Sequence, residues 1–600
     1  MQARQLPLDV SASSLFPPAV SSLLRPLEPA LNRWFFPDRL LRCVPDMREG
    51  EFSATEFSRQ LLHNLDIGYH VPPQDVARIP ARGPALLVAN HPFGFLEGLI
   101  LLSLLEDVRA DYRIVANGLL SSVPALTGRL IFVNPFSERA CPHENGLRLR
   151  SSLEWLRAGG LLVMFPAGEV AHLNWGERPV ADPVWNSTAA RLARKVNCPA
   201  LPVFFEGANS RQFQMLGAIH PSLRTLNLPN ELVKKRNQTV SIRVGSVISA
   251  AVLKSYADPE AATEYLRART YLLGSRPVTA GNEVFSVWAS KPKAVAKPPS
   301  ADLIAREISS LPPDRVLARN DDFTVYVAEA AEIPLTLREI GRCRELTYRE
   351  IGEGTGRALD LDEFDAYYRH ILLWHPGDAR VAGAYRMVAT PDVLATRGIG
   401  GLYSSTLFHY QPEFFERIGP AFELGRSFVC REYQKQYAPL LLLWKGISAC
   451  VAARPECAVL FGAVSVSSEY QALSRTLIVN FLDGHVASSL SSWIRPRRGL
   501  RKALVPKHVK RLGRLLPTVE ELSSSIQDLE ADGKGLPVLI RQYLKAGGQL
   551  LGFNVDPHFS NALDVLVMAD LRAASGPMLE RCMGQEAASS FRAWHASKNS

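Results

Sequence analysis

Short apolar segments alternate with helical stretches from about residue 80 to residue 275, and this alternation restricts the fold more than any other feature. Segments of strand length lie at residues 86–88, 113–116, 130–133, 161–165, 200–205 and 240–244. Helical patterns lie between them, at residues 146–158 and 184–195. Strands that alternate with helices form a sheet covered by helices, so the sequence predicts an α/β domain. Sites in such folds form beyond the carboxyl ends of the strands.

A second mixed α/β pattern begins near residue 323 and continues to about residue 575. We expect strands at 323–328, 380–388, 423–429, 458–466, 549–554 and 565–570, and helices at 335–351, 440–453 and 537–546. Between the two patterns, residues 290–300 read S-K-P-K-A-V-A-K-P-P-S, which is typical of a linker. We therefore predict five parts, at residues 1–75 (helical), 76–280 (α/β), 281–322 (linker), 323–575 (α/β) and 576–600 (tail).

The first 75 residues contain apolar residues at helical spacing between prolines, including Leu15, Phe16, Leu31, Trp34 and Phe35. Tryptophan and phenylalanine beside arginine suit a membrane surface, and packing against the next domain is the alternative. No signal peptide is expected, and no window approaches the roughly 20 apolar residues of a membrane span. The sequence therefore predicts a cytoplasmic protein, soluble or peripherally bound to the inner membrane.

The overall charge indicates an anionic partner without identifying it. The 600 residues carry a formal net charge of +9, with a pI near 9.1. Nucleic acid, an anionic lipid surface and an acidic carrier protein all fit this charge. The eight cysteines are scattered without a C-x-x-C pair, which favours a reducing compartment and argues against a zinc site. We expect no metal and no bound cofactor.

The stretch V-A-N-H-P-F-G-F-L-E-G, at residues 88–98, places His91 and Glu97 directly after an apolar strand. A carboxylate that orients an imidazole allows the other ring nitrogen to accept the proton of an alcohol. A structural histidine at the strand end is the alternative. The pair is therefore a candidate catalytic dyad whose support must come from neighbouring motifs.

Three further motifs follow at expected strand ends. They are G-R-L-I-F-V-N with Gly128 and Arg129, F-P-A-G-E with Phe165, Pro166, Gly168 and Glu169, and L-P-V-F-F-E-G at residues 201–207. In this order the four motifs resemble those of the glycerolipid and lysophospholipid acyltransferase family, over about residues 80–250. The resemblance implies acyl transfer from a thioester to a hydroxyl, with His91 as general base, Glu97 orienting it, and the other named residues binding substrate. Backbone N–H groups of the Phe-Pro-x-Gly turn would hold the acceptor or an oxyanion.

Two departures from the family pattern concern the acceptor. The family spacing His-x4-Asp is here His91-x5-Glu97, and the third motif lacks the acid, threonine and arginine of F-P-E-G-T-R. A site without that arginine is poorly suited to a glycerol phosphate head group. The variant looks like the haemolysin-like branch and the ornithine-lipid acyltransferases.

The second α/β segment carries its own group of charged residues, namely Asp362, Asp365, Arg386, Glu423 and Arg426. Carboxylates near a buried arginine can bind a cationic amine or assist its deprotonation, and a structural ion-pair network is the alternative. In this order the residues resemble those of N-acyltransferases of the acyl-homoserine-lactone-synthase type, which have the GNAT fold, and more closely the ornithine N-acyltransferases. The resemblance covers about residues 323–575. It implies an acceptor-amine site at these five positions, with Glu423 and Arg426 as catalytic residues.

The expected acyl donor is an acyl carrier protein rather than acyl-CoA. Where acetyl-CoA enzymes carry a glycine-rich loop, residues 434–439 read Q-K-Q-Y-A-P, and Tyr437 and Pro439 obstruct a pyrophosphate. The stretch 493–516 is rich in arginine and lysine and has no acid. We expect its basic residues to dock the acidic carrier or anionic lipid, with an ordinary solvated basic face as the alternative. The predicted docking residues are Arg495, Arg497, Arg498, Arg501 and Lys502. Nucleic acid is disfavoured because aromatic residues are scarce there.

Both halves together resemble the bifunctional ornithine-lipid synthases. This resemblance implies that the C-terminal domain first acylates ornithine with a 3-hydroxyacyl chain, and that the N-terminal domain then acylates the 3-hydroxyl of the lyso-ornithine lipid. One alternative is a lysophospholipid O-acyltransferase whose second domain acts on another amino acid or only binds acyl carrier protein. The other is a non-catalytic membrane-surface protein. The amino acid acceptor (ornithine, lysine, glutamine or glycine) is not specified by the sequence.

Overall fold

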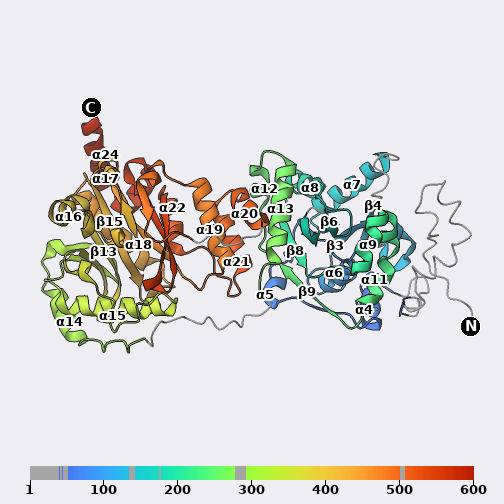
Figure 1. Cartoon of the computed structure of the whole chain (residues 1–600), viewed down its shortest axis with the longest axis horizontal. Helices are drawn as coiled ribbons and strands as arrows, with labels where there is room; N and C mark the ends of the chain where they lie inside the picture. Colours follow the sequence, from blue (N-terminus) through green and yellow to red (C-terminus); the bar gives the residue numbers. More distant parts are fainter. Residues whose placement is uncertain are drawn as a thin grey trace, which may run out of the picture. The chain divides into compact units, whose positions relative to one another are not determined.

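The computed structural model describes residues 40, 43–44, 52–133, 142–174, 177–277, 292–500 and 507–599. The chain divides into two compact units (Figure 1). Unit 1 comprises residues 1–278, 515–517 and 527–533, and unit 2 comprises residues 279–514, 518–526 and 534–600. Each unit contains its own central sheet.

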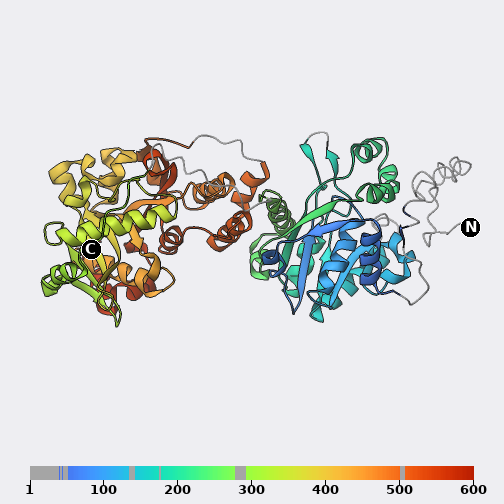
Figure 2. The same cartoon turned by 90° about the horizontal axis from the view of Figure 1, so that it is seen from below.

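Unit 1 is built on a seven-stranded sheet whose order is β1-β9-β8-β2-β5-β3-β4, with a separate hairpin of β6 and β7. All neighbouring pairs are parallel except β8 and β9. The strands lie side by side in Figure 2, coloured from blue to green. Their bounds are β1 Gly68–His70, β2 Ala85–Ala89, β3 Tyr112–Asn117, β4 Leu130–Val133, β5 Leu161–Met164, β6 His172–Asn174, β7 Glu177–Ala181, β8 Ala200–Phe205 and β9 Thr239–Val244.

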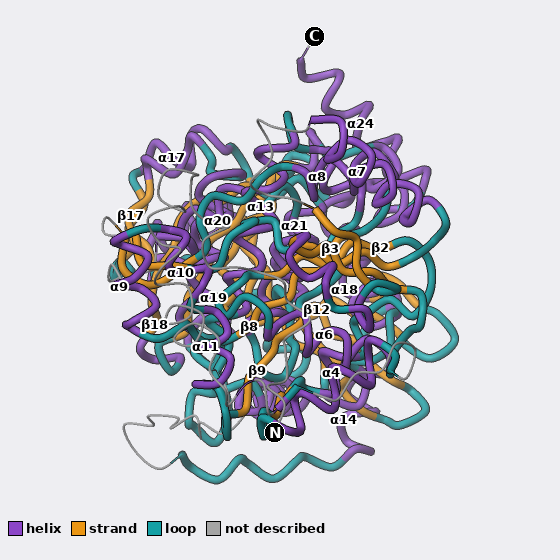
Figure 3. The backbone as a smooth tube through the Cα atoms, turned by 90° about the vertical axis from the view of Figure 1, so that its right-hand side faces the viewer, coloured by secondary structure: helices purple, strands orange, loops and turns teal. Residues whose placement is uncertain are grey.

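Helices cover both faces of this sheet, because β2 and β5 are buried along their whole length. Helices α4 and α6 pack on one face, and α7, α8 and α13 pack against strands and each other elsewhere. The bounds are α4 Ala54–Asn64, α5 Pro73–Val76, α6 Leu96–Glu106, α7 Pro142–Arg157, α8 Thr188–Val196, α9 Arg211–Ile219, α10 Pro221–Leu226, α11 Leu228–Lys234, α12 Ala250–Ser255 and α13 Pro259–Leu273. The alternation of strands (orange) and helices (purple) can be followed in Figure 3.

Unit 2 is built on an eight-stranded sheet of order β10-β11-β12-β13-β15-β16-β19-β18, with a separate pair of β14 and β17. Its neighbours are antiparallel except β15 and β16, which pair in parallel over only three residues, from Ala421↔Val459 to Glu423↔Phe461. The two strands are therefore paired at their start and not beyond it. The bounds are β10 Val316–Arg319, β11 Thr324–Ala328, β12 Arg369–His375, β13 Arg380–Ala389, β14 Phe408–Tyr410, β15 Ala421–Val429, β16 Val459–Val466, β17 Ile494–Pro496, β18 Gln549–Asp556 and β19 Ala562–Asp570.

The helices in the second half of the chain include two long ones, α15 and α18, that contact strands of this sheet. The bounds are α14 Ala301–Ser309, α15 Pro334–Glu350, α16 Thr390–Arg397, α17 Pro412–Ile418, α18 Ala438–Ala453, α19 Ala472–His485, α20 Lys507–Leu515, α21 Val519–Leu529, α22 Val538–Lys545, α23 Gly576–Met583 and α24 Gln585–Asn599. None of the helices in the described ranges has both the length and the apolar character that a bilayer span requires.

The predicted α/β character of both segments is confirmed, and the structure adds elements that the sequence pattern did not indicate. Strand β12 and helices α13 and α19 were not predicted. Regular structure in unit 2 begins before residue 323, because α14 and β10 precede it and β10 joins the sheet. Most of the N-terminal segment, including Leu15 and Trp34, lies outside the described residues.

Unit 1 includes a buried carboxylate, Asp528, from its late segment 527–533. Asp528 pairs with the fully buried Arg269 at 2.8 Å and with Arg78 at 2.9 Å. It also accepts hydrogen bonds from the backbone N–H and the hydroxyl of Ser246, both at 2.8 Å. A buried ion pair needs such additional bonds to offset the loss of hydration.

Candidate active sites

The loop after β2 places His91 and Glu97 at the carboxyl end of the unit 1 sheet. Asn90 fixes the start of this loop, because its side-chain amide donates to the carbonyl of Phe205 and accepts from the N–H of Phe205. The loop leads into α6, where Glu97 is the second residue. The position after a parallel strand agrees with the expectation for sites in α/β folds.

Glu97 folds back over the loop that precedes it. Its Oε1 atom accepts backbone hydrogen bonds from Phe93 at 2.6 Å and from Gly94 at 3.2 Å. Gly94 has φ +100°, and a Cβ there would lie 2.8 Å from Cδ2 of Leu228. This turn therefore requires glycine, and it fixes the carboxylate in place.

His91 and Glu97 are in electrostatic contact. Nδ1 of His91 lies 3.3 Å from Oε1 of Glu97, and the His91 side chain is 17% exposed. The atoms are at ion-pair distance, but their alignment is not that of a hydrogen bond. Burial disfavours the imidazolium, but the negative charges of Glu97 and Asp182 together outweigh burial, so the pKa of His91 is raised. With Nδ1 facing Glu97, Nε2 is the nitrogen that can accept a proton from a substrate.

Asp182, which the sequence analysis did not identify, supports the same histidine. Its Oδ1 atom accepts a hydrogen bond from the backbone N–H of His91 at 3.1 Å, and its Oδ2 atom accepts one from the indole of Trp185 at 2.8 Å. Its own backbone N–H donates to the hydroxyl of Tyr271 at 2.8 Å. Burial raises the pKa of Asp182. Asp182 comes 91 residues after His91, so no local pattern could reveal the contact.

The F-P-A-G-E loop lies against the histidine, as predicted. The rings of His91 and Phe165 stack with centroids 4.5 Å apart. Gly168 has φ +70°, and its N–H donates to the carbonyl of Phe165 at 3.0 Å, which closes the turn. The carbonyl of Pro166 accepts hydrogen bonds from the backbone N–H and side-chain amide of Asn186. The structure thus brings Phe165, Pro166 and Gly168 together with His91.

A guanidinium is present beside this loop, although the motif contains no arginine. Arg224 of α10 donates to Glu169 at 2.8 Å. The Arg224 side chain is largely buried, whereas that of Glu169 is mostly exposed. The motif itself could not indicate this cation, because it comes from a helix 55 residues further along the chain. Because Glu169 neutralises the charge of Arg224, this arginine is not a free cation that could bind a phosphate group.

Gly128 and Arg129 are not brought to the histidine. They precede β4, so they lie at the amino end of a strand that is parallel to β3. Arg129 pairs with Glu106 at the last residue of α6, at 2.9 Å, while Glu97 lies in the first turn of that helix. The structure does not bring these two residues to the histidine, and their part in substrate binding stays a prediction.

The charged residues of unit 2 meet around a fully buried arginine, Arg386 of β13. Its Nη1 atom lies 2.5 Å from Asp362 and 3.2 Å from Asp365. Among the described residues, its Nε and Nη2 atoms have no hydrogen-bond partner, and the guanidinium lies over the rings of Tyr403 and Tyr368 at 5.0 and 5.1 Å. Arg386 therefore retains two donor groups that could bind an anion.

Arg344 and Asp360, which the sequence analysis did not identify, extend this network. Arg344 pairs with Asp365 at 2.9 Å and with Asp360 at 3.1 Å. Arg426 lies 3.6 Å from Asp360 and 3.5 Å from Asp362, and it adopts φ +50°, which is uncommon for a residue with a side chain. Three arginines thus face three aspartates. This balance favours the structural ion-pair alternative for the aspartates, and their role in binding an amine stays a prediction.

Glu423 belongs to a different group of contacts from the arginines. Its carboxylate accepts backbone hydrogen bonds from Ser404 at 2.7 Å and from Tyr403 at 3.0 Å, and it also accepts one from the hydroxyl of Tyr368. Burial raises the pKa of Glu423, and these donors oppose the rise. Glu423 and Arg426 do not form an ion pair, and the catalytic role of each stays a prediction.

The predicted carrier-docking residues fall partly within the described structure. Arg495 lies in β17, and Arg497 and Arg498 follow it, all three exposed. Arg501 and Lys502 lie outside the described residues. The Q-K-Q-Y-A-P stretch leads directly into α18, with Tyr437 at its N-cap and exposed. Its position between β15 and α18 agrees with the expectation.

Comparison with known proteins finds one family match in each half of the chain. A family model described as Acyltransferase matches residues 49–281, and one described as Acetyltransferase (GNAT) domain matches residues 343–444. The chain thus has an acyltransferase-like N-terminal domain and a GNAT-like C-terminal domain. The predicted acyltransferase class and the two-domain fold class are thereby confirmed.

Curated proteins similar to this chain include N-acyltransferases and an O-acyltransferase. A glycine N(alpha)-acyltransferase of Bacteroides thetaiotaomicron is 33% identical over 32% of this chain and 60% of that protein. A lyso-glycine lipid O-acyltransferase of Phocaeicola vulgatus is 25% identical over 37% of this chain and 78% of its own length. An L-ornithine N(alpha)-acyltransferase of Rhodobacter capsulatus is 27% identical over 40% of this chain and 88% of its own length. The crystal structure of the 1-acyl-sn-glycerophosphate acyltransferase PlsC of Thermotoga maritima is 17% identical, covers 38% of this chain and 80% of its own, and has a TM-score of 0.25.

Proposed function

We propose that the chain is a bifunctional acyltransferase that makes ornithine lipid in two steps. Unit 2 acylates the α-amine of ornithine with a 3-hydroxyacyl chain from acyl carrier protein, and unit 1 then acylates the 3-hydroxyl of the lyso-ornithine lipid. The observation that carries the proposal is the His91–Glu97 contact beside the F-P-A-G-E loop, in a chain that also contains a GNAT domain.

The second step follows from the geometry around His91. Nε2 of His91 accepts the proton of the 3-hydroxyl as its oxygen attacks the thioester carbonyl. The tetrahedral intermediate then breaks its carbon–sulfur bond and releases the thiolate of the carrier, which takes the proton from the imidazolium. Glu97 stabilises that imidazolium at 3.3 Å, and Phe165 stacks on the ring and holds its plane. The products are the diacylated lipid and the free carrier thiol.

The first step requires a neutral amine to attack the thioester carbonyl in unit 2. The two donor groups of Arg386 without partners suit the carboxylate of an amino acid acceptor. The short parallel pairing of β15 and β16 leaves their later residues unpaired with each other, beside Glu423. Fusing the two domains keeps the amphiphilic intermediate at a high effective concentration near the second site.

Glycine is the second candidate acceptor, because two relatives named glycine N(alpha)-acyltransferase are 33% and 29% identical to this chain. The same two steps would then give a glycine lipid. An acyltransferase whose GNAT domain acts on another amino acid, or only binds acyl carrier protein, is the remaining enzymatic alternative. The two domain matches disfavour a non-catalytic membrane-surface protein.

Expression in a host that lacks aminolipids tests the proposal. We expect a ninhydrin-positive, phosphorus-free lipid whose hydrolysis releases ornithine. Release of glycine would support the second candidate instead. An unchanged lipid profile, in cells that contain the folded chain, would contradict both. Association with the inner membrane is part of the proposal, and fractionation of the same cells would test it.

A further inference from the structure

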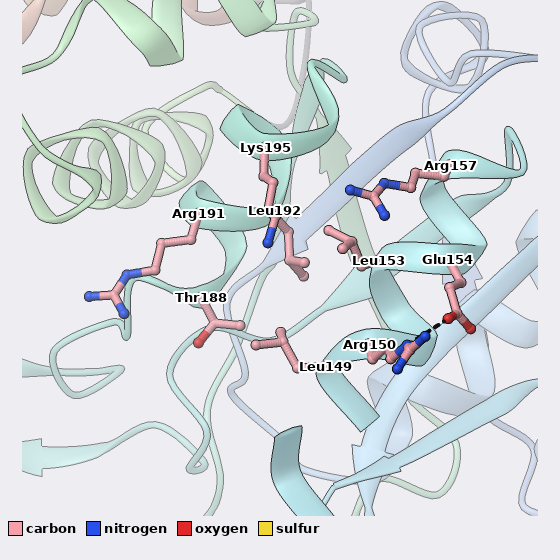
Figure 4. Close-up of a pocket in the computed structure, with 9 residues that line it drawn as sticks. All are labelled: Leu149, Arg150, Leu153, Glu154, Arg157, Thr188, Arg191, Leu192 and Lys195. Carbon is pink, nitrogen blue, oxygen red and sulfur yellow. Dashed lines mark hydrogen bonds and ion pairs between the residues drawn. The ribbon is translucent and has the colours of Figure 1, made fainter. Parts of the chain in front are cut away.

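A basic groove runs along the surface of unit 1 between α7 and α8 (Figure 4). Its volume is about 640 Å³, and its walls are the outward faces of the two helices. On α8 the lining residues Thr188, Arg191, Leu192 and Lys195 follow helical spacing. The alanines of α8 are buried, whereas Arg191 and Lys195 on the groove side are exposed.

Cations dominate the rim of this groove. Arg150, Arg157, Arg191 and Lys195 line it together with one carboxylate, Glu154. Arg150 pairs with Glu154 at 3.0 Å, and Arg191 pairs with Glu260 at 2.7 Å. Among the described residues, Arg157 and Lys195 form no ion pair, and Figure 4 shows them extending from opposite helices toward each other. The groove therefore presents unneutralised positive charge.

Leucines form an apolar strip between these cations. Leu149 and Leu153 lie one turn apart on α7, and Leu192 faces them from α8 (Figure 4). Leu149 is 45% exposed at the rim, whereas Leu192 is 3% exposed at the floor. A concave apolar strip flanked by cations is complementary to an amphipathic helix that carries carboxylates beside its apolar residues.

One end of the groove adjoins the candidate active site. The lining residue Thr188 begins α8, and Asn186, two residues earlier, donates to the carbonyl of Pro166 in the F-P-A-G-E loop at 2.6 Å. The stacked ring of Phe165 then connects this loop to His91. From Thr188 to Lys195 the groove extends about 10 Å along the helix axis. A partner held in the groove would therefore lie beside the loop that contacts the catalytic histidine.

We propose that this groove docks the acyl carrier protein that supplies the acyl chain for the O-acylation step. The inference rests on the proposed function of unit 1 and adds the surface that its donor recognises. It is distinct from the basic residues around Arg495, which belong to unit 2. The carrier is the acidic, helical donor whose thioester must reach His91.

The shape of the groove favours a protein helix over other anionic partners. A bilayer surface is contacted by apolar side chains that protrude, whereas Leu192 is recessed at the floor. Acyl-CoA carries all its phosphates at its nucleotide end, but the cations here are distributed along both helices, from Arg150 and Arg191 to Arg157 and Lys195. Electrostatic docking of an acidic protein uses such distributed charge, and it weakens with salt.

The test is steady-state O-acylation by the full chain, with lyso-lipid acceptor and three donors: acyl carrier protein, acyl-CoA and acyl-N-acetylcysteamine. The double variant Arg157→Glu/Lys195→Glu should raise KM for the carrier-protein donor about tenfold or more and leave kcat/KM for acyl-N-acetylcysteamine unchanged. Added salt should raise KM for the carrier protein in the wild type and less in the variant. The matched control is Arg82→Glu/Arg211→Glu, which reverses two exposed cations outside the groove and should change neither value.

Several results would overturn the proposal. One such result is an unchanged KM for the carrier protein in the groove variant. Another is a fall in kcat/KM for acyl-N-acetylcysteamine as large as the fall for the carrier protein. A rise in KM for acyl-CoA alone would assign the groove to that ligand. Weaker sedimentation with phosphatidylglycerol vesicles, at an unchanged donor KM, would assign it to a membrane. If the wild type forms no O-acylated product from any donor, the proposed function fails instead.

Discussion

Glu97 reaches His91 because it turns back over its own helix start, where the N–H groups of Phe93 and Gly94 hold its Oε1 atom. The extra residue in His91-x5-Glu97, relative to the family spacing, is accommodated by this turn at Gly94. The carboxylate raises the pKa of His91 against the effect of burial. At the residue scale, the site is therefore a buried dyad whose orientation depends on backbone N–H groups.

Glu97→Gln should change the pH dependence of O-acylation. The base must be neutral, so activity falls as the pH drops through the raised pKa of His91. Removing the carboxylate leaves burial, which lowers that pKa, opposed by the charge of Asp182. The acidic limb of the pH–rate profile should therefore move to lower pH while kcat falls on the order of 10²-fold. Asp107→Asn, at an exposed carboxylate that caps the other end of α6, serves as control. An unshifted acidic limb would contradict the role of Glu97.

Glu353→Gln should stabilise unit 2 at alkaline pH. Glu353 is buried and accepts a hydrogen bond from the hydroxyl of Ser465 at 2.6 Å, and burial raises its pKa to about 7. The folded state therefore binds this proton more tightly than the unfolded state, so wild-type stability is lost as the pH rises from about 4.5 to 7. The loss is about 3 kcal/mol. Thermal unfolding should show a higher Tm for the variant at pH 8 and a smaller difference at pH 5; equal differences at both pH values would refute this.

At the scale of elements, local patterns identified the strands that carry the sites and did not identify contacts between distant segments. Strands β2, β4 and β8 lie where the apolar runs predicted them, because buried parallel strands are continuous hydrophobic segments. Asp182 and Arg224 reach the first site from segments far along the chain, so only the fold reveals them. The position of Gly128 and Arg129 away from His91 was not apparent, because a motif does not state which end of its strand it occupies.

Gly462→Ala should disrupt the junction of β15 and β16. A Cβ at Gly462 would lie 2.1 Å from the backbone carbonyl oxygen of Leu424, next to the paired residues Glu423 and Phe461. One strand must move, so unit 2 should lose about 2 kcal/mol or more, and N-acylation should fall.

The matched control for this variant is Gly484→Ala. Gly484 is an exposed position in α19 with no atom near its added Cβ. Alanine is favoured over glycine within a helix, so this variant should be neutral or more stable by up to about 1 kcal/mol. Denaturant unfolding measures both variants. Equal stability of Gly462→Ala and the wild type would show that the two strands are not held as the structure has them.

At the scale of the whole molecule, each compact unit is formed from segments that are separated in the sequence. Residues 527–533 belong to unit 1, although they come about 250 residues after its main segment ends. The contacts of Asp528 with Arg269, Arg78 and Ser246 explain why the segment belongs to unit 1. The sequence offered no sign of this, since a single aspartate in a polar stretch indicates no partner.

Asp528→Ala should destabilise unit 1 despite its late position. The change deprives the fully buried Arg269 of a carboxylate at 2.8 Å, and loss of one partner of a buried pair costs about 3–5 kcal/mol. Differential scanning calorimetry should show a lower transition temperature for unit 1. An activity assay should show a loss of O-acylation. Asp532→Ala, at an exposed carboxylate of the same segment, should leave the transition temperature of unit 1 unchanged. If Asp528→Ala unfolded at the same temperature as the wild type, the result would contradict the structural role of the segment.

The lipids formed by His91→Ala in an aminolipid-free host test the central claim most directly. His91 is the only proton acceptor assigned to the second step, so the variant should accumulate the N-acylated lyso lipid and no diacylated lipid. Glu423→Ala, which acts on the first step, should give neither product. Mass spectrometry of the extracted lipids distinguishes these outcomes. Formation of the diacylated lipid by His91→Ala would contradict the assignment of O-acylation to unit 1.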